Sequence, residues 1–210
     1  MVAVRVVIAN YGAGNLRSVA RAVSYVGGDP IISAKPRDIA DADAVIMPGV
    51  GSAADTMLNL NQHGLVGPLL DFMTRGGSFL GVCMGQQILF EMSEEGGEHP
   101  CLGVLRGRVS CLPTGLKVPH IGWNRVRSLR AHPIFEGIKD GSFFYFVHSY
   151  YPQPDDPSVV VAVADYGLTF PAVIARGSVV ATQFHPEKSG EIGLRLYKNF
   201  LRIAASNARD

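Results

Sequence analysis

Short apolar runs alternate with segments of helical pattern along the first half of the chain. The runs occupy residues 4–9, 30–34, 44–49 and 78–83. Helical patterns follow them at about 15–26, up to about residue 75, and from the last run to Met92. Such alternation is typical of βαβ units, in which successive strands lie parallel and helices cover the sheet.

The second half follows a different pattern after the acidic, glycine-containing segment 93–100. Strand-like runs succeed one another with little helix between them, at residues 104–112, 143–151, 159–164 and 172–184. Within the last run, Ala-Arg-Gly-Ser-Val is typical of a hairpin turn. A closing helix is expected from about Gly190, with apolar side chains on one face. The sequence predicts one α/β domain over residues 1–210, a mostly parallel sheet wrapped by helices with an antiparallel extension in its second half.

The composition is that of an ordinary soluble protein without a bulk charge. Lys and Arg number 19 against 18 Asp and Glu, so charge alone recruits neither nucleic acid nor an anionic membrane. No run approaches the roughly 18 apolar residues of a membrane span, and the apolar N-terminus is too short for a signal sequence with its cleavage site. We therefore expect a cytoplasmic protein.

Three cysteines, Cys83, Cys101 and Cys111, are odd in number and lack C-x-x-C spacing. This argues against a disulfide framework and against a zinc site, and we expect neither a metal nor a cofactor. Cys101 and Cys111 have no distinctive sequence context and are expected to be structural. Cysteine chemistry in this chain should be that of a free thiol.

Cys83 stands in the stretch Gly81-Val82-Cys83-Met84-Gly85, directly after an apolar run. The stretch matches the small-x-nucleophile-x-small elbow, with cysteine in place of serine. The tight turn from strand to helix leaves no room for a Cβ two positions away on either side, which accounts for both glycines. A helix N-terminus favours a thiolate, and the Met84 amide can face an oxyanion. An isolated free cysteine is more often merely buried, but this context favours a nucleophile.

A cysteine nucleophile needs a base, and His185 is the strongest candidate. It ends an apolar strand in Gln-Phe-His-Pro-Glu, with Glu187 two residues further on. Alternate residues of an extended segment face the same way, and Pro186 favours an extended conformation at His185, so the carboxylate can meet the imidazole. Taken alone, the pair fits a strand-end histidine beside a solvated glutamate equally well. His120 and His148 are rival bases, but neither has a carboxylate close in sequence.

A loop that completes an oxyanion hole is expected at residues 47–53, after another apolar run. Gly49 and Gly51 let peptide N–H groups approach a ligand or reorient, although the segment alone also fits an ordinary strand-to-helix turn. Residues 10–18 also follow a strand, but Arg17 occupies the third glycine position of a dinucleotide-binding fingerprint. A nucleotide cofactor is therefore not expected.

Together, Pro-Gly-Val-Gly-Ser, Gly-Val-Cys-Met-Gly-Gln-Gln and Gln-Phe-His-Pro-Glu-Lys-Ser resemble the class I (triad) glutamine amidotransferases, whose domain spans about the length of this chain. The segments beginning at Asn10, Lys117 and Phe146 are similar to the glutaminase subunits of imidazole glycerol phosphate synthase, and unlike the subunits serving anthranilate, carbamoyl phosphate or guanylate synthesis. Asn10, Ala53 and Gln86 depart from the residues common in the family. The resemblance implies a flavodoxin-like open, mostly parallel twisted sheet with helices on both faces.

The resemblance also implies a mechanism for these residues. Cys83 attacks the side-chain amide of L-glutamine, and His185, oriented by Glu187, protonates the departing ammonia and then activates water against the thioester. The oxyanion site and its switch would involve Val50, Gly51 and Met84. The glutamine would be bound by Gly49, Gln87, Ser149 and Tyr150.

From the length of the sequence, we expect no acceptor synthase in the same chain beside the glutaminase domain. The resemblance implies that a partner consumes the ammonia, namely the cyclase subunit of imidazole glycerol phosphate synthase, a (β/α)8 barrel docked over the site. Lys188 and Trp123 are expected at that interface, unless the lysine is merely solvated and the tryptophan belongs to the core. The family is known for a glutaminase that is nearly idle until the partner binds its nucleotide substrate. We expect the switch to be a peptide rotation within residues 49–51.

Two other functions stay open at this point. A cysteine peptidase or hydrolase of a related flavodoxin-like family commonly has histidine directly after the cysteine, where this chain has Met84. A catalytically inactive subunit that only binds and stabilises a synthase would be under no demand to keep Cys83, His185 and Glu187 together. Glutamine hydrolysis discriminates among the three possibilities.

Overall fold

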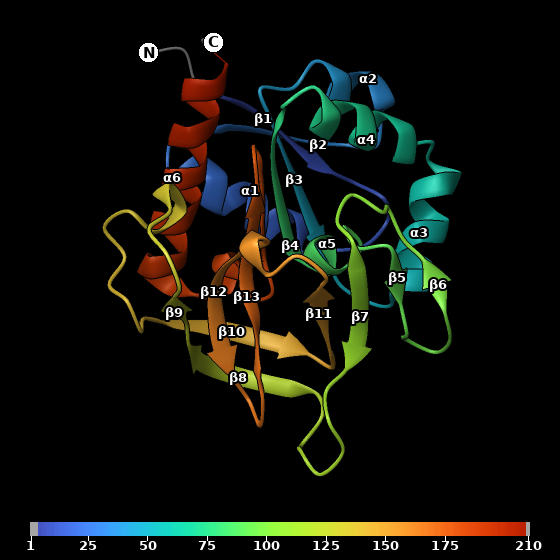
Figure 1. Ribbon diagram of the computed structural model, residues 1–210. Coiled ribbons are helices and arrows are strands. Elements are labelled where there is room, and N and C mark those ends of the chain that lie inside the picture. Colours follow the sequence, from blue (N-terminus) through green and yellow to red (C-terminus); the bar gives the residue numbers. More distant parts are fainter. Residues whose placement is uncertain (1–3, 209–210) are drawn as a thin grey trace.

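The computed structural model describes residues 4–208, and an eight-stranded sheet runs through its centre (Figure 1). Five parallel strands come first in the sheet order: β2 (Asp29–Ser33), β1 (Arg5–Ala9), β3 (Ala44–Gly49), β4 (Ser78–Cys83) and β14 (Val179–Thr182). Three antiparallel strands continue it: β13 (Thr169–Arg176), β12 (Val160–Asp165) and β9 (Arg127–Ser128). Numbered within the parallel part alone, the order is that of flavodoxin-like folds.

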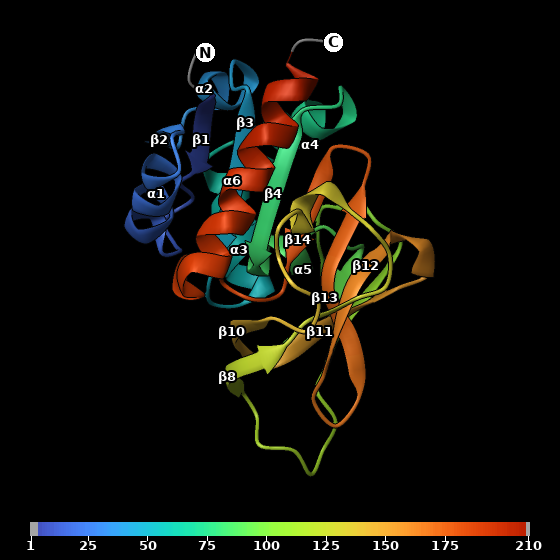
Figure 2. The same cartoon turned by 90° about the vertical axis from the view of Figure 1, so that its left-hand side faces the viewer.

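Helices cover both faces of the parallel strands, as the alternation of strand side chains requires. Val6 and Ile8 of β1 pack in the cluster that includes α1 (Leu16–Tyr25) and α6 (Gly190–Asn207), which lie side by side (Figure 2). The next residues along the strand, Val7 and Ala9, pack in the cluster on the other face. That cluster includes α2 (Pro36–Ala40), α3 (Ala53–Gln62) and α4 (Val66–Thr74).

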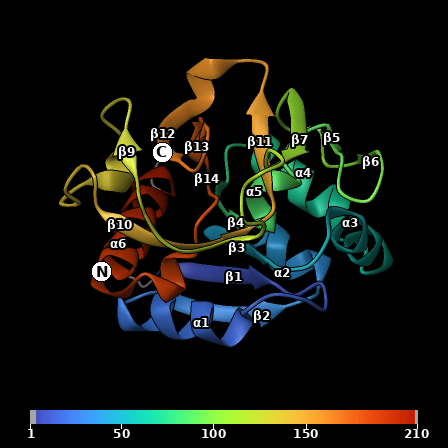
Figure 3. The same cartoon turned by 90° about the horizontal axis from the view of Figure 1, so that it is seen from below.

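Two small sheets lie beyond the carboxyl ends of β3 and β4 (Figure 1). One pairs β8 (His120–Arg125) with β10 (Phe143–His148), and Figure 3 shows β10 running across the end of the parallel sheet. The other comprises β11 (Tyr150–Pro154), β7 (Gly107–Cys111), β5 (Met92–Ser93) and β6 (His99–Pro100). Ligands of open α/β sheets bind outside the carboxyl ends of the strands, so these two sheets frame the place where a site is expected.

The predicted architecture is confirmed, including the hairpin between β13 and β14. Arg176 pairs with Val179 across a two-residue loop in which Gly177 has a φ of 58°. Within residues 4–208, no helix is long and apolar enough to cross a membrane. Cys111 lies exposed on β7, so its expected structural role gains no support from burial.

The helix predicted from the elbow to Met92 is wrong in its length. Helix α5 covers only Met84–Gln87, and the chain then turns. The carbonyl of Ile88 accepts from Leu102 N at 2.9 Å, and the two following carbonyls accept from Leu105 and Gly103 at 2.8 and 2.9 Å. Backbone groups that a longer helix would satisfy internally are thus bonded to a loop that the sequence pattern does not reveal.

Candidate active site

Cys83 occupies a strained turn between β4 and α5. Its φ of 55° and ψ of −105° make it the one non-glycine residue with positive φ across the described range 4–208. A non-glycine side chain in such a conformation costs on the order of 1–3 kcal/mol and persists only where packing imposes it. The turn projects the cysteine out of the sheet at the end of β4, as the elbow pattern predicts.

The two glycines of the elbow are required by contacts that the structure shows. A Cβ added at Gly81 would lie 2.3 Å from the carbonyl oxygen of Gly85, and one added at Gly85 would lie 2.1 Å from that of Met47. Neither glycine has a positive φ, so the need is one of space and not of backbone conformation. The elbow is therefore packed directly against β3 and against itself.

Cys83 opens into a cavity of about 280 Å³. Most of the predicted site residues line this cavity. They come from the loop after β3, the end of β4, helix α5, the start of β11 and the segment after β14: Val50, Gly51, Cys83, Met84, Gln87, Ser149, Tyr150 and His185. Four residues that sequence reasoning does not assign to the site also line it: Glu95, Pro119, Val147 and His148. Gly49 does not line it, because it packs beneath Met84, whose Cβ would lie 2.3 Å from a Cβ at that position.

His185 and Glu187 form a buried pair beside the cavity that Cys83 borders. The imidazole Nδ1 lies 2.9 Å from Glu187 Oε1, and the two side chains are only 2% and 1% exposed. The short 3-10 turn Pro186–Lys188 brings the carboxylate back onto the ring, and Ser189 Oγ donates to the His185 carbonyl at 2.7 Å. Nε2, the other ring nitrogen, is buried without a hydrogen-bond partner in the described part of the chain, while the ring borders the cavity that holds Cys83.

The surroundings of His185 favour its protonated form. Burial lowers its pKa, but the neighbouring Cys83 sulfur and then the hydrogen-bonded Glu187 carboxylate outweigh burial and raise the pKa to about 10. The raised pKa favours the imidazolium, which carries a hydrogen on both ring nitrogens. Such a ring can serve as the acid for a departing amine.

Two amide side chains connect the elbow to the strand that precedes His185. Gln87 Nε2 donates to the Tyr150 carbonyl at 2.9 Å and to Gln183 Oε1 at 3.1 Å. Gln183 Nε2 in turn donates to Cys83 Sγ at 3.7 Å. Both donors of the Gln87 amide are thus used, and its Oε1 remains as an acceptor in a side chain that lines the cavity.

A second acceptor, Glu95, comes from the loop after β5. Its Oε2 accepts from Ala53 N at 2.9 Å, which ties this loop to the start of α3. The sequence does not single out Glu95, because it lies in a run of acidic residues typical of a solvated loop. Its partner is 42 positions away in the chain, so no local signal points to it.

The segment expected to complete an oxyanion hole differs in packing from the elbow it faces. Tyr11, wholly buried in the loop after β1, donates its hydroxyl to the Pro48 carbonyl at 2.9 Å. Beyond that anchor Val50 is 42% exposed, and Gly51 has a φ of 89° with no heavy atom within 4 Å of the position that a Cβ would take. The segment is held at Pro48 and again at Ala53, and it is open between them at Val50 and Gly51.

The site geometry agrees with what comparison with known proteins finds. The family model described as glutamine amidotransferase class-I matches residues 7–204. The chain belongs to the class-I glutamine amidotransferases. A solved structure described as a crystal structure of glutamine amidotransferase has the same fold, with a TM-score of 0.76 and 23% identity over 95% of this chain and 98% of that one.

Relatives of this amidotransferase match over almost their whole length. A protein of Dehalococcoides mccartyi named imidazole glycerol phosphate synthase subunit HisH is 46% identical over 204 residues, which are 97% of this chain and 100% of that protein. A protein of Aquifex aeolicus with the same name is 48% identical over 201 residues, 95% of this chain and 97% of that one.

The departures from common family residues leave the amidotransferase cavity intact. Asn10 uses its Oδ1 to accept from Gly12 N at 3.1 Å, and Ala53 is the buried residue whose amide holds Glu95. Gln86 is wholly buried and donates to the Ala181 carbonyl at 3.3 Å, away from the cavity lining.

Trp123 and Lys188 lie on the surface of the amidotransferase. Trp123 is 56% exposed and its ring lies edge-on to Tyr145, with centroids 6.1 Å apart. Lys188 is also exposed, and its Nζ lies 5.7 Å from the centroid of the same tyrosine ring. The expectation of a core tryptophan is thereby excluded, and the two residues share one surface beside the triad.

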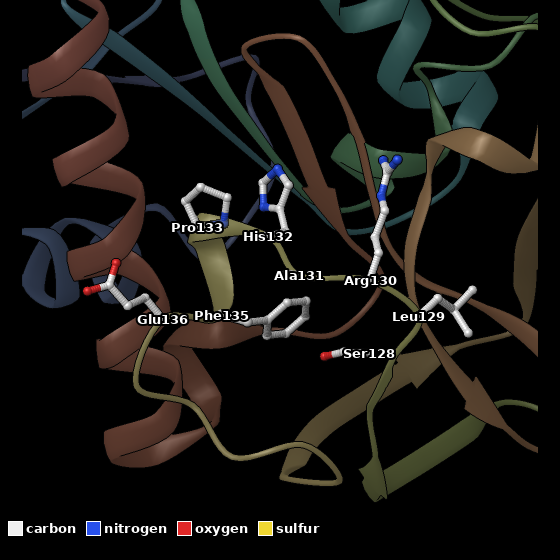
Figure 4. Close-up of a pocket in the computed structure, with 8 residues that line it drawn as sticks. All are labelled: Ser128, Leu129, Arg130, Ala131, His132, Pro133, Phe135 and Glu136. Atoms are coloured by element: carbon white, nitrogen blue, oxygen red, sulfur yellow. The ribbon is translucent and has the colours of Figure 1, made fainter.

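A larger hollow of about 710 Å³ elsewhere on the surface lacks the features of a site (Figure 4). Its lining comes from one stretch of chain around the turn Pro133–Phe135. Figure 4 shows Arg130 and Glu136 at opposite ends with their charged groups directed apart, and Glu136 pairs with Arg202 of α6. It has no cysteine and none of the buried unpartnered polar atoms found among the described residues.

Proposed function

We propose that this amidotransferase is the glutaminase subunit of an imidazole glycerol phosphate synthase. It would hydrolyse L-glutamine to glutamate and ammonia through a Cys83 thioester and supply the ammonia to a cyclase subunit in histidine biosynthesis, in the cytoplasm. The observation that carries the proposal is one cavity bordered by a strained-elbow cysteine and by His185, which Glu187 holds at 2.9 Å. The near-full-length relatives support the identity of the synthase.

The reaction follows from the positions of these three residues. The Cys83 sulfur gives its proton to His185 Nε2, attacks the amide carbon of glutamine and forms a tetrahedral oxyanion. The C–N bond then breaks as His185 gives its proton to the leaving nitrogen, releasing ammonia and leaving a thioester. Neutral His185 next takes a proton from water, whose oxygen attacks the thioester, and the C–S bond breaks to return the sulfur and release glutamate. Nδ1 of His185 donates its hydrogen to Glu187 in every step. Nε2 is therefore the ring nitrogen that takes up the proton and gives it to the leaving ammonia.

Charge complementarity supports the glutamine-binding residues. The α-ammonium of glutamine needs acceptors, and Gln87 and Glu95, which line the cavity, carry an amide oxygen and a carboxylate that can serve as such. The α-carboxylate needs donors, for which we propose the backbone around Ser149 and Tyr150. Gly49 would act indirectly, because its lack of a side chain lets Met84 lie close to β3.

For the oxyanion we propose the backbone amides of Met84 and of the Val50–Gly51 segment. Met84 is buried and fixed in α5, whereas the opposite segment is exposed and unpacked. A peptide rotation in residues 49–51 would then complete the hole and switch the enzyme on. This proposal fails if an activated complex keeps that segment in its resting conformation.

The partner we propose is the cyclase subunit of the synthase, a (β/α)8 barrel docked over the cavity mouth. Trp123 and Lys188 would lie at that interface, since both are exposed beside the triad. Residues 1–210 would then act as one glutaminase domain; residues 1–3 and 209–210 lie outside the described structure.

Glutamine hydrolysis by the complex tests the proposal. The chain is assayed alone and with its cyclase and that cyclase's nucleotide ligand, as wild type, as Cys83→Ala and as Cys111→Ala, a matched change of the exposed free cysteine. We expect Cys83→Ala to abolish hydrolysis and Cys111→Ala to leave it unchanged. Equal rates for wild type and Cys83→Ala would overturn the nucleophile. A wild type that supports only ammonia-dependent cyclisation would mark an inactive binding subunit, and peptide hydrolysis would mark a cysteine peptidase.

A further inference from the structure

Two buried histidines face each other behind the cavity, and the proposed reaction uses neither of them. His120 on β8 and His148 on β10 are cross-strand partners, 4% and 5% exposed, with Nδ1 of the first 2.9 Å from Nε2 of the second. The ring of His120 stacks on Tyr166 and Phe146, with centroids 4.0 and 5.2 Å apart. His148 lines the catalytic cavity.

The partners of the two rings determine which nitrogen carries each proton. His148 Nδ1 lies 2.9 Å from the Tyr150 carbonyl oxygen, which can only accept, so Nδ1 is the donor. Nε2 of the neutral ring is then an acceptor and takes its hydrogen from Nδ1 of His120. His120 Nε2 is left as an acceptor, and the Asn124 amide nitrogen lies 3.4 Å from it. The same Asn124 nitrogen donates its other hydrogen to the Asp165 carbonyl at 2.9 Å. The donor and acceptor roles assigned to the two imidazole rings therefore agree with those of their neighbours.

Both rings lie where the neutral form is favoured. Burial, aided by the neighbouring His120 and His185 and opposed by the Tyr150 carbonyl, lowers the pKa of His148 to about 4. Burial also lowers the pKa of His120. A proton on His148 Nε2 would meet the Nδ1–H of His120. Moving the His120 hydrogen to Nε2 would relieve that clash only by directing it at the Asn124 amide nitrogen, which is itself a donor.

The same Tyr150 carbonyl is the acceptor for the amide of Gln87, and the bonds continue to the nucleophile. Gln87 Nε2 is 2.9 Å from that carbonyl and 3.1 Å from Gln183 Oε1, and Gln183 Nε2 is 3.7 Å from Cys83 Sγ. An unbroken series of donors and acceptors therefore runs from β8 to the sulfur. Each amide in it has one orientation that satisfies its neighbours.

We propose that His120 and His148 are positioning residues, a neutral pair with hydrogen on both Nδ1 atoms that fixes the Tyr150 carbonyl and thereby the amide orientations of Gln87 and Gln183. The pair keeps Gln87 Oε1 turned to the cavity as an acceptor for the substrate ammonium and keeps an N–H of Gln183 on the Cys83 sulfur. The proposal rests on the proposed glutaminase function for its kinetic consequences. Its spectroscopic consequences stand without that function.

The first test reads the proton positions directly. Two-dimensional 15N spectra of the full chain with labelled histidine report the tautomer of each ring. We expect both rings neutral and Nδ1-protonated at pH 7, and His120→Phe, which keeps an aromatic ring in the stack, to alter the His148 signals. An Nε2-protonated or charged His148 in the wild type would overturn the proposal.

The second test separates positioning from a general structural role. His148→Leu removes the donor to Tyr150, His148→Asn replaces Nδ1 by an amide N–H, and Tyr166→Phe alters the same aromatic stack without touching the series. In the complex with the cyclase, we expect His148→Leu to raise the KM for glutamine by roughly tenfold, the loss of about one well-placed hydrogen bond, with a smaller change in kcat. We expect His148→Asn to recover most of the loss and Tyr166→Phe to leave KM unchanged.

A purely structural role predicts a different result, because a smaller folded fraction lowers apparent kcat and leaves KM as it was. Alkylation of Cys83 by iodoacetamide, followed by mass spectrometry of its peptide, adds a readout that needs no glutaminase activity. We expect His148→Leu to change that rate and His148→Asn to restore it. If wild type does not hydrolyse glutamine, the proposed function fails, and the tautomers and alkylation rates still decide this proposal. Unchanged KM and alkylation in His148→Leu would refute it.

Discussion

Gly85→Ala tests whether the elbow depends on close packing against β3. An added Cβ would lie 2.1 Å from the Met47 carbonyl oxygen, whereas real Cβ atoms essentially never lie within 3.0 Å of another heavy atom, so backbone must move by about 0.9 Å. Gly85 has no positive φ, and alanine therefore introduces no conformational strain of its own. The displaced atoms belong to the helix that begins directly after Cys83 and carries the Met84 amide.

The magnitude follows from that displacement. A misplacement of about 1 Å in a catalytic array costs roughly a hundredfold in rate, which is about 2.7 kcal/mol of transition-state stabilisation. Overpacking of this kind also lowers the free energy of unfolding by about 1–3 kcal/mol. We therefore expect Gly85→Ala to be folded at 25 °C and to lose about two orders of magnitude in kcat/KM for glutamine.

The assay is glutaminase activity of the complex, with urea unfolding of each variant in parallel. Gly64→Ala is the matched control, because Gly64 has a φ of 63° with open space around it. Alanine there costs about 1–2 kcal/mol of stability through its backbone conformation alone, far from the elbow. We expect Gly64→Ala to be destabilised and fully active. Wild-type kcat/KM in Gly85→Ala, or equal activity losses in the two variants, would refute the reasoning.

Three further predictions follow from single groups. Cys83→Ala should lower the pKa of His185 from about 10, because the Cys83 sulfur is the largest influence that raises it. An NMR titration of His185 that is unchanged in the variant would contradict the interaction between Cys83 and His185. Tyr11→Phe should destabilise the protein by about 1 kcal/mol in urea, because the buried Pro48 carbonyl loses its donor, and a stability equal to wild type would show that the bond contributes nothing. His148, with its pKa lowered from 6.5 to about 4, stays neutral in the folded state while the unfolded chain binds a proton, so the free energy of unfolding should fall as the pH drops through that window. His148→Asn should flatten this pH dependence, and an identical dependence would rule the residue out as its source.

The sequence predicts the geometry of the elbow and of the His185–Glu187 pair well because their determinants are local. Two glycines flank Cys83 within five residues, and Glu187 meets His185 across two positions, so pattern and spacing carry the geometry. The parallel sheet is predictable for the same reason, since alternation along the chain marks each βαβ unit. The sequence pattern overestimates the length of the helix after Cys83, because Ile88 and its neighbours are apolar and fit a helix. In the structure, the carbonyls of these residues are bonded to a loop that begins near residue 102.

Residues that act through distant partners could not be predicted in this way. Glu95 is tied to an amide 42 positions away, and Gln87 meets Gln183 across 96 positions. Their roles depend on the register between separate sheets, which a single sequence does not encode as a spacing. His148 is only a rival base by its sequence context, which shows no partner, and in the structure its partner is another histidine on the neighbouring strand.

The packing around the cavity divides the catalytic parts into a rigid group and an adaptable one. Cys83 is fixed by its two flanking glycines, where an added Cβ would lie only 2.3 and 2.1 Å from backbone oxygens, and His185 is held from behind by a buried carboxylate. Gly51, which faces them, has open space around it, and Val50 is exposed. A partner that docks on this surface can therefore change the oxyanion segment at low cost, whereas any change in the elbow would require backbone to move against backbone. Activation by another subunit should act on the loop and leave the nucleophile where it is, so the resting and activated states should differ in the 49–51 peptides and agree at Cys83.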